Sequence, residues 1–338
     1  MLFDHALNTK LKASCIVFLY FSDGALIKFP INFRIFYKEK GNMPWHKQNR
    51  HPHKKKYYLA VEMIEWATKK MDFPKCTVVA DSWYGIGPFV RELKRLKLSY
   101  ILEVKASYNV KVACKVPKLT PTGKKAKKQY DLICLPKYFK LISTSKNCGF
   151  AANSETGKKE KVLYHTKVDT VRLNLISGKQ RVVQSYDPVM KTYKYLLTDQ
   201  HTWEASKILT DYTFRWVIEE FFRNAKQLTD MEGATIRSEQ GVTLSLGLVS
   251  WIDFLLHFEN YKRGIADKLS KESLTIPSIV RQFQYENMVT VIDKIQNDED
   301  FVRKWLEVVE KDIKRNRKKR KDLEMLGDTE LPLVKNAA

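Results

Sequence analysis

The sequence has few cysteines, and none of them forms a Cys-x-x-Cys pair. The five are odd in number and widely separated: Cys15, Cys76, Cys114, Cys134 and Cys148. A disulfide framework or a thiolate zinc site needs cysteines in closely spaced or matched sets. The sequence therefore argues against both, and it is typical of a protein from a reducing compartment.

Long apolar runs are also missing. Polar and charged residues such as Asp4, His5 and Lys10 interrupt the start of the chain, so no secretory leader is expected. The most apolar later stretch, residues 242–258, contains Asp253 and is too short to cross a bilayer, so we expect a buried helix there. These features predict a cytoplasmic protein, associated with the nucleoid, that has no membrane partner.

What the sequence has in excess is positive charge. Sixty Lys and Arg face thirty-eight Asp and Glu, which gives a net charge of +22. The apolar share of 44% and aromatic share of 12% indicate a globular protein with a sizeable core rather than a disordered one. Such a surplus favours binding to phosphate polyanions, and composition alone makes nucleic acid the best partner. Ribosomal and membrane-surface proteins carry similar charge, so the charge by itself does not identify the class of protein.

The first hundred residues show alternating strand and helix signals. Residues 14–21 and 25–36 are β-rich and are joined at Ser22-Asp23-Gly24, which predicts a hairpin. Residues 57–70 have helical periodicity. A short apolar run at 76–80 then ends on Asp81. A helix over 88–95 and a strand over 98–104 complete an expected β-α-β unit.

The periodicity changes twice further along. From 105 to 200 it is of the β type, interrupted by turns at Ser177-Gly178 and Asp187-Pro188, and helices return from residue 201. We therefore expect a core in two parts, 1–104 and 201–262, with a β-rich insertion over 105–200 and a helical, basic region over 263–338. Two basic stretches, Lys124–Lys128 and Lys311–Lys321, are either solvated or in contact with DNA.

One segment places four polar side chains at suggestive positions. Tyr212, Arg215, Glu219 and Lys226 fall within a narrow stripe if residues 211–226 form a single helix, at roughly 0°, 300°, 340° and 320°. The opposite arc is apolar and is expected to be buried: Phe214, Val217, Ile218, Phe221, Phe222 and Ala225. By periodicity alone, an ordinary amphipathic helix with an ion-pair ladder explains this pattern.

The identity of these four residues favours a catalytic motif over an ordinary amphipathic helix. The spacing Tyr-x2-Arg-x3-Glu-x6-Lys, with Trp216 beside Arg215, resembles the third catalytic motif of DDE transposases of the insertion-sequence-four type. The segment VVADSWYG at 78–85 resembles their second motif, in which an Asp follows a buried strand. The resemblance covers about residues 14–262. It implies an α/β, RNase-H-like fold with a mixed sheet and helices, interrupted by an all-β insertion before the Glu-bearing helix.

The same resemblance implies a chemistry and a set of partners. Asp81 and Glu219 would hold two Mg²⁺ or Mn²⁺ ions, and the enzyme would hydrolyse phosphodiesters at transposon ends and join them to target DNA. Tyr212, Arg215 and Lys226 would hold DNA phosphates. Trp216 would either stack on a displaced base or pack in the core. A homodimer in a synaptic complex is a possible assembly.

The sequence departs from the family's motif pattern at the first catalytic carboxylate. The family carries an Asp in the first sheet strand, usually as Asp-Asp-Thr, and this sequence has none. Residues 1–13 show no convincing strand, Asp4 is the only acid there, and Asp23 fits a hairpin turn. We also expect the helical domain that recognises transposon ends to be absent. A copy truncated at its 5′ end, inactive or nearly so, is the simplest interpretation.

Other interpretations stay open at this point. The chain could be a non-catalytic DNA-binding remnant of a transposase, or an RNase-H-like nuclease without strand transfer. His46, His51 and His53 suggest a metal site only weakly, because no clustered acid or cysteine completes it.

Overall fold

A computed structural model describes residues 2–4, 9–11, 15–24, 27–37, 53–114, 130–153, 159–229, 231, 238–266, 275–304, 306–308 and 310–311. The chain divides into two compact units, residues 1–276 and 277–338. The second unit contains most of helix α8 (Ile276–Asn297). His46, His51, the Lys124–Lys128 stretch and residues 312–321 of the second basic run lie outside the described residues.

The predicted N-terminal hairpin is confirmed. Strands β3 (Cys15–Ser22) and β4 (Lys28–Phe36) pair antiparallel. In the turn, Gly24 has a φ of +78°, in the left-handed region that favours glycine. The Gly24 amide donates to the Ser22 hydroxyl at 3.1 Å, and the Ile27 amide donates to the Asp23 carboxylate at 3.0 Å. Asp23 therefore serves the turn, as expected.

The expectation that residues 1–13 contain no strand is wrong. Strands β1 (Leu2–Asp4) and β2 (Thr9–Leu11) pair antiparallel as a separate two-stranded sheet. Each strand has only three residues, which is too short for a period-two alternation to show in the sequence.

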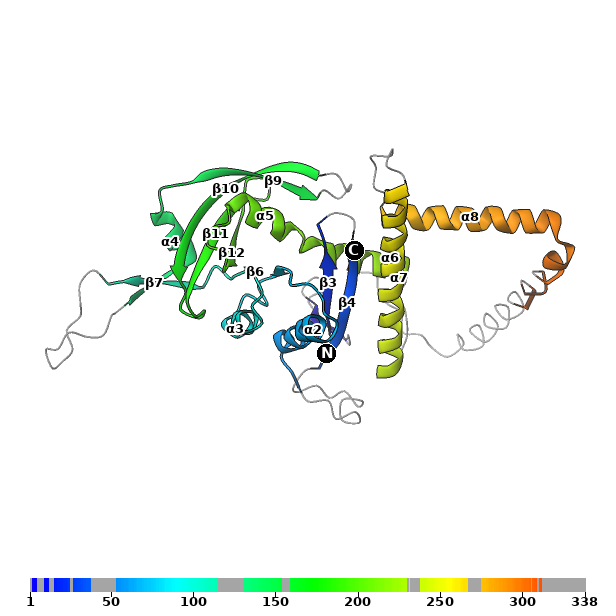
Figure 1. Ribbon diagram of the computed structural model, residues 1–338, viewed down its shortest axis with the longest axis horizontal. Helices are drawn as coiled ribbons and strands as arrows, with labels where there is room; N and C mark the ends of the chain where they lie inside the picture. The colour runs from blue at the N-terminus through cyan, green and yellow to red at the C-terminus, as the bar shows by residue number, and fades with distance from the viewer. Residues whose placement is uncertain are drawn as a thin grey trace, which may run out of the picture. The chain divides into compact units, whose positions relative to one another are not determined.

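The main sheet has six strands in the order β5-β6-β12-β11-β10-β9 (Figure 1). Strands β5 (Val78–Ala80) and β6 (Tyr100–Glu103) are parallel and are joined by helix α3 (Gly87–Arg95), which confirms the predicted β-α-β unit. The other strands pair antiparallel: β12 (Thr192–Thr198), β11 (Lys179–Asp187), β10 (Lys159–Arg172) and β9 (Lys146–Asn153). The sheet is therefore mixed, as expected.

The region expected to be an all-β insertion differs in two respects. It contains a helix, α4 (Leu135–Leu141), which follows the hairpin of β7 (Asn109–Ala113) and β8 (Tyr130–Cys134). Proline in the first turn of α4 costs no hydrogen bond, and Leu135 and Phe139 are fully buried. Moreover, β12 pairs directly with β6, so these strands extend the core sheet.

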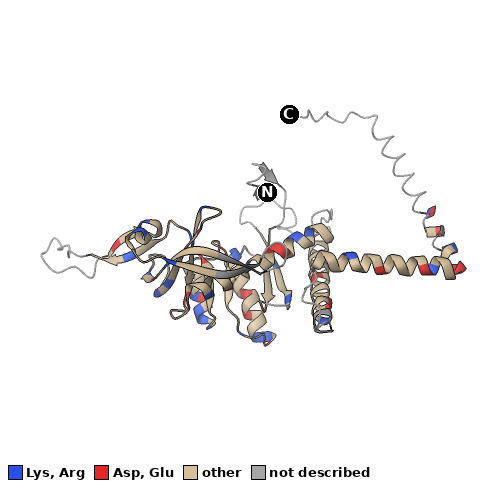
Figure 2. Ribbon diagram, turned by 90° about the horizontal axis from the view of Figure 1, so that it is seen from above, with Lys and Arg blue, Asp and Glu red and all other residues tan. Residues whose placement is uncertain are grey.

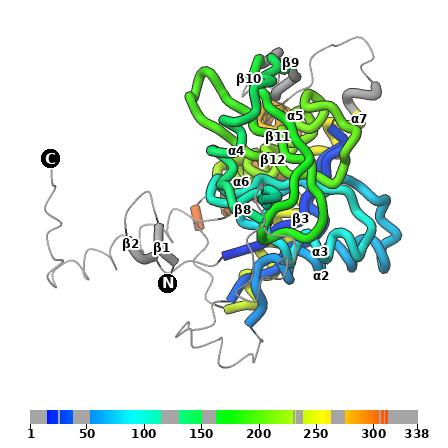
Figure 3. Tube along the Cα trace, turned by 90° about the vertical axis from the view of Figure 1, so that its left-hand side faces the viewer, coloured from blue at the N-terminus to red at the C-terminus, as the bar shows by residue number. Residues whose placement is uncertain are grey.

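Helices cover both faces of the sheet. Helices α2 (Lys56–Lys70) and α3 lie side by side and share one apolar cluster with β6, β11 and β12 (Figure 3). Helix α5 (Ala205–Thr213) packs on the other face, where Ile208 and Leu209 meet Ile101, Val183 and Leu196. Burial on both faces explains the continuous apolar character of residues 100–102.

The β3–β4 hairpin forms a third cluster with helices α6 (Trp216–Leu228) and α7 (Glu239–Ala266). Phe18 and Phe221 lie at its centre, with ring centroids 4.9 Å apart. The expectation of a fully buried helix over 242–258 is wrong, because α7 buries only the face that carries Leu246, Val249 and Asp253. The expectation that this stretch is too short to cross a bilayer is also wrong, because residues 239–262 are long and apolar enough to do so. One such helix is weak evidence for a membrane span, and α7 packs on β4.

A buried polar cluster ties α7 to the hairpin. The Tyr20 hydroxyl donates to the Asp253 carboxylate at 2.7 Å, and His257 Nε2 lies 3.8 Å from the other Asp253 oxygen. Burial raises the pKa of Asp253 from its ordinary value of 3.8 to about 6, against the lowering effects of Tyr20 and Lys28. Burial, assisted by Lys28, lowers the pKa of His257 to about 4. The charged form of each group is therefore disfavoured in the fold.

This cluster predicts a pH-dependent stability difference. Because the folded pKa of Asp253 is raised, its stabilising contribution is complete below about pH 4 and is lost as the pH rises to about 6. Asp253→Asn, which keeps an acceptor for Tyr20, should gain stability relative to the native chain over that interval, by up to roughly 3 kcal/mol. Denaturant unfolding from pH 4 to 8 measures this. A difference that stays constant with pH would contradict the prediction.

Candidate functional site

Asp81 follows β5 at its carboxyl end, where open α/β sheets place ligand groups. The Trp83 amide donates to its carboxylate at 2.9 Å, and the Tyr84 amide donates to its carbonyl at 3.1 Å. The chain therefore turns tightly after the strand. The turn holds the Asp81 carboxylate at the end of the sheet.

The motif that contains Tyr212, Arg215 and Glu219 does not lie on one continuous helix. The single helix over residues 211–226 on which the predicted stripe depended is therefore not formed. Helix α5 ends at Thr213 and α6 begins at Trp216, so Tyr212 is on α5 and Arg215 is the residue that caps α6. Between them, the Arg215 amide donates to the Tyr212 carbonyl at 3.1 Å, in a tighter i→i+3 turn. The Phe214 ring packs against the hairpin turn, where a Cβ on Gly24 would lie 2.7 Å from its Cζ.

Within α6, the apolar arc is directed inward as predicted. Val217, Phe221 and Ala225 are buried, while Glu219 lies in the first turn of the helix. Arg215 forms an ion pair with Glu219, and its guanidinium lies 5.9 Å from the ring centroids of both Tyr212 and Trp216. Burial would lower the pKa of Arg215, but pairing with Glu219 outweighs it and the net pKa is raised.

Asp81, Arg215 and Glu219 come together on the wall of one cavity of about 400 Å³. The cavity lies between strands β3 and β5, with α2 and α6 contributing to its walls. Its lining residues are Ile16, Val17, Phe18, Leu19, Lys56, Ala60, Ile64, Val78, Val79, Ala80, Asp81, Trp83, Tyr84, Phe89, Arg215, Ile218, Glu219 and Phe222. The two carboxylates and a cation therefore share one recess.

Two residues at this site were not singled out from the sequence. Glu103, the last residue of β6, accepts a hydrogen bond of 2.6 Å from the Tyr212 hydroxyl. Burial and this bond raise the pKa of Tyr212 well above its ordinary value. Trp83 lines the cavity with 69% of its surface exposed, and the Lys56 ammonium lies 5.2 Å from its ring centroid. A Trp two residues after a strand-end Asp is the sequence signal that could have identified Trp83.

The remaining candidate residues lie at the periphery. Trp216 is 41% exposed, so it is not a core residue. Lys226 is exposed in the last turn of α6 and does not line the cavity. Tyr212 is buried, and its hydroxyl is directed to Glu103.

Asp81 and Glu219 meet only some of the requirements of a divalent-metal site. Within the described part of the chain, no group of three or more His, Cys, Asp or Glu lies close enough to hold a metal ion. Asp81 and Glu219 supply hard oxygen ligands of the kind that Mg²⁺ and Mn²⁺ prefer. Two carboxylates alone do not complete a two-ion site, so these residues fit such a centre only in part.

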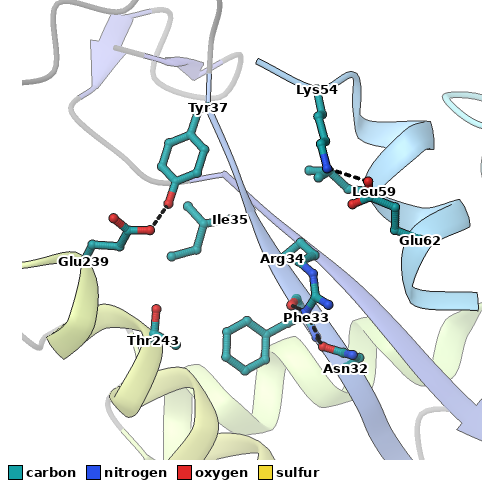
Figure 4. Close-up of a pocket in the computed structure, with 10 residues that line it drawn as sticks. All are labelled: Asn32, Phe33, Arg34, Ile35, Tyr37, Lys54, Leu59, Glu62, Glu239 and Thr243. Carbon is teal, nitrogen blue, oxygen red and sulfur yellow. Dashed lines mark hydrogen bonds and ion pairs between the residues drawn. The ribbon is translucent and has the colours of Figure 1, made fainter. Parts of the chain in front are cut away.

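A second cavity of similar size lies between β4, α2 and α7 (Figure 4). Its polar side chains already have partners. The Arg34 guanidinium donates to Asn32, Lys54 pairs with Glu62, and the Tyr37 hydroxyl donates to Glu239 at 2.6 Å. The charged groups of this cavity are therefore already paired, and the Tyr37–Glu239 bond ties the end of β4 to α7. The cavity beside Asp81 is the better candidate site.

The turn after Asp81 depends on a glycine. A Cβ added at Gly85 would lie 2.1 Å from the carbonyl oxygen of Glu103, which is backbone and cannot move aside cheaply. Gly85→Ala should therefore destabilise the fold by about 1–3 kcal/mol, measured by denaturant unfolding. Gly247→Ala is the matched control, because a Cβ there meets nothing within 4 Å in a helix interior. It should stabilise by roughly 0.5–1 kcal/mol, and equal effects at the two positions would contradict this account.

The mixed sheet and its flanking helices make this an α/β protein, and they are consistent with an RNase-H-like fold. The comparison with protein families agrees. The model of the transposase DDE domain matches residues 47–252, more than half of the chain, and the chain belongs to this family. The matched segment contains Asp81, Glu103, Arg215 and Glu219. No curated protein matches the sequence.

Proposed function

We propose that this chain is the catalytic core of a cut-and-paste DNA transposase of the insertion-sequence-four type. The observation that carries the proposal is that Asp81 and Glu219, 138 positions apart, line one cavity together with Arg215. The family match supports a transposase. The reaction would be hydrolysis of phosphodiesters at transposon ends followed by transfer of the end to target DNA.

The divalent ions of such a site would activate the attacking oxygen and stabilise the leaving one. Asp81 and Glu219 would be two of their ligands. In the structure Arg215 neutralises Glu219, so we propose that Arg215 turns to a DNA phosphate when ions bind. Guanidinium groups are suited to this role because they match the phosphate geometry with paired donors.

We further propose that the first carboxylate comes from a strand between β3 and β5. Among the described residues β3 pairs only with β4 and β5 only with β6, so each has one edge without a strand partner. Four consecutive residues of β3 and three of β5 line the same cavity. A strand placed there would join the hairpin to the main sheet and bring its side chains beside Asp81.

Lys226, Trp216 and Tyr212 would have different roles in this proposal. Lys226 would contact phosphates farther along the DNA, and exposed Trp216 would stack on a base. Tyr212 would act indirectly, because its hydroxyl holds Glu103 and its ring supports Arg215. The alternative of a non-catalytic DNA-binding remnant keeps these contacts and lacks the chemistry. The observation on its side is that no cluster of three metal-ligand residues lies among the described residues.

DNA binding is expected to be strongly dependent on salt. Lys and Arg occur on many elements of the described chain (Figure 2), and the net charge is +22. Replacing Arg215 and Lys226 with Ala should reduce the slope of log affinity against log salt by about two, one per phosphate contact. Fluorescence anisotropy with duplex DNA between 50 and 300 mM salt measures it.

The matched control for this experiment is another Arg and Lys pair. Arg172 and Lys179 are exposed, face each other across β10 and β11, and do not line the cavity. Their double Ala variant should leave the slope nearly unchanged. Equal slopes for the two double variants would show that the proposed site makes no particular contact with DNA, and salt-independent binding would contradict the proposal as a whole.

A further inference from the structure

Trp83 presents a large aromatic ring to solvent at the edge of the cavity that contains Asp81. The side chain lines that cavity and is nevertheless exposed. Its place is set by the tight turn after β5, because the Trp83 amide donates to the Asp81 carboxylate at 2.9 Å. A single exposed aromatic ring is common on protein surfaces, and its surroundings distinguish this one.

Two lysines from separate elements lie near this ring. Lys56 is the first residue of α2, and its ammonium is 5.2 Å from the ring centroid. Lys105 follows the end of β6, and its ammonium is 5.8 Å from the same centroid. Because β5 and β6 are parallel neighbours, their carboxyl ends lie at one edge of the sheet, which brings Trp83 and Lys105 together. We call Trp83, Lys56 and Lys105 the Trp83 platform.

The fold alone does not account for the two positive charges of the platform. Neither ammonium forms an ion pair with a carboxylate of the described residues. Lys56 also occupies the first turn of α2, where the backbone amides make the helix end positive and a cation is unfavourable. That turn contains no acidic residue and no side-chain cap. A bound anion would be stabilised by both lysines and by the helix end.

The same charges decide what covers the ring. An apolar segment of protein placed on Trp83 would bury two ammonium groups without a counter-charge, which is costly. A nucleotide avoids this cost, because it joins an aromatic base to phosphate groups. Stacking of a base on an aromatic ring is stronger than an exposed cation–π contact, so a base can displace the ammonium groups from the ring toward the phosphates. Bases inside a duplex are already stacked, so only an unpaired nucleotide can use the ring.

We propose that the Trp83 platform binds one nucleotide of an unpaired DNA strand. The base stacks on Trp83, and Lys56 and Lys105 hold the phosphates on either side of it. Little sequence preference is expected, because every base has a π face. The assignment of this strand to the DNA end cleaved beside Asp81 rests on the proposed function, whereas the binding itself does not. Trp216, beside Arg215, is a separate residue with its own role.

Fluorescence anisotropy of the full chain with two labelled single strands of about 10 nucleotides tests this inference. One strand is oligo-dT, and the other is abasic, so it keeps the phosphates and lacks the bases. The oligo-dT strand should bind more tightly. Trp83→Ala should weaken its binding about 5- to 150-fold, the range for loss of one stacked base, and should leave binding of the abasic strand unchanged.

Two variants serve as controls for the ring. Trp83→Phe keeps an aromatic face and should retain most of the preference for oligo-dT. Trp251→Ala removes another exposed tryptophan, which does not line the cavity, and should leave both affinities unchanged. Thermal unfolding by circular dichroism shows whether each variant is folded.

The lysines should act on both strands equally, because their contacts are with phosphates. Lys56→Gln and Lys105→Gln should each reduce the slope of log affinity against log salt by about 0.7 for either strand. Lys70→Gln, in the last turn of α2, is the matched control and should leave the slope unchanged.

Three results would overturn the inference: equal affinity of the native chain for the two strands, an equal loss on both strands for Trp83→Ala, or no loss for that variant. If Trp216→Ala alone abolished the preference for oligo-dT, the stacking residue would be Trp216 and the platform would be refuted. The assay requires no cleavage, so these results are distinct from a failure of the extended chain to cut DNA, which would refute the proposed function.

Discussion

The 338-residue chain should cleave DNA that carries its cognate terminal repeats at least about 100-fold more slowly than a chain extended by an in-frame upstream strand with Asp-Asp-Thr. Asp81 and Glu219 supply two carboxylates, and no described cluster of three ligand residues accompanies them. Ions held by two carboxylates bind weakly and orient the attacking oxygen poorly. Losses of this kind raise the barrier by several kcal/mol, and each 1.4 kcal/mol is about tenfold in rate.

A nicking assay with Mg²⁺ or Mn²⁺ compares the two chains directly. In the extended chain, the same strand with Asn in place of both Asp residues is the matched control, because it fills the cavity between β3 and β5 without adding charge. Efficient cleavage by the 338-residue chain would contradict the proposal that a further strand between β3 and β5 supplies the first carboxylate. If Asp4→Ala then abolished that cleavage, Asp4 would be the first carboxylate.

Within the extended chain, Glu219→Gln and Asp81→Asn are each expected to lower the cleavage rate by about 1,000-fold or more. Each substitution keeps the size of the side chain and removes a charged ligand from the site, so the effect should fall on the rate and leave DNA binding nearly intact. Single-turnover cleavage and anisotropy on the same DNA separate the two quantities.

The neighbouring residue offers a close control. Glu220 is on the same helix turn, but it pairs with Lys28 at 3.4 Å and does not line the cavity. Glu220→Gln should cost stability slightly and leave the rate within a fewfold of the starting chain. A comparable loss of rate for Glu220→Gln and Glu219→Gln would show that the effect comes from the helix and not from the site.

The parts of the fold that were predictable are those encoded by local patterns. The hairpin turn needs Gly24 in a left-handed conformation, and the short apolar run before Asp81 is typical of a strand covered on both faces. The break between α5 and α6 was missed because it arises from packing. The residues around Phe214 keep helical dihedrals, and the tight turn accompanies the contact of Phe214 with the distant Gly24.

The residues of the site also divide into those that a local motif identifies and those that only the fold brings together. Asp81, Arg215 and Glu219 could be identified because their spacing is itself a motif, and the structure brings them to one cavity. Glu103 could not, because its link to Tyr212 spans 109 positions and depends on the pairing of β5 with β6. The exposure of Leu244, Leu248 and Trp251 on α7 could not be predicted either, since a helix that is apolar on most sides gives no periodic signal for which face is covered.

Crystals of the extended chain bound to a transposon-end duplex and soaked in Mn²⁺ give the most direct test of the central claim. Anomalous scattering locates Mn²⁺ independently of the protein atoms. The account predicts two ions roughly 3.5–4 Å apart, coordinated by the carboxylates of Asp81 and Glu219, with Arg215 released from Glu219 to a phosphate. Ions bound elsewhere, or Asp81 and Glu219 on opposite sides of the bound DNA end, would contradict it.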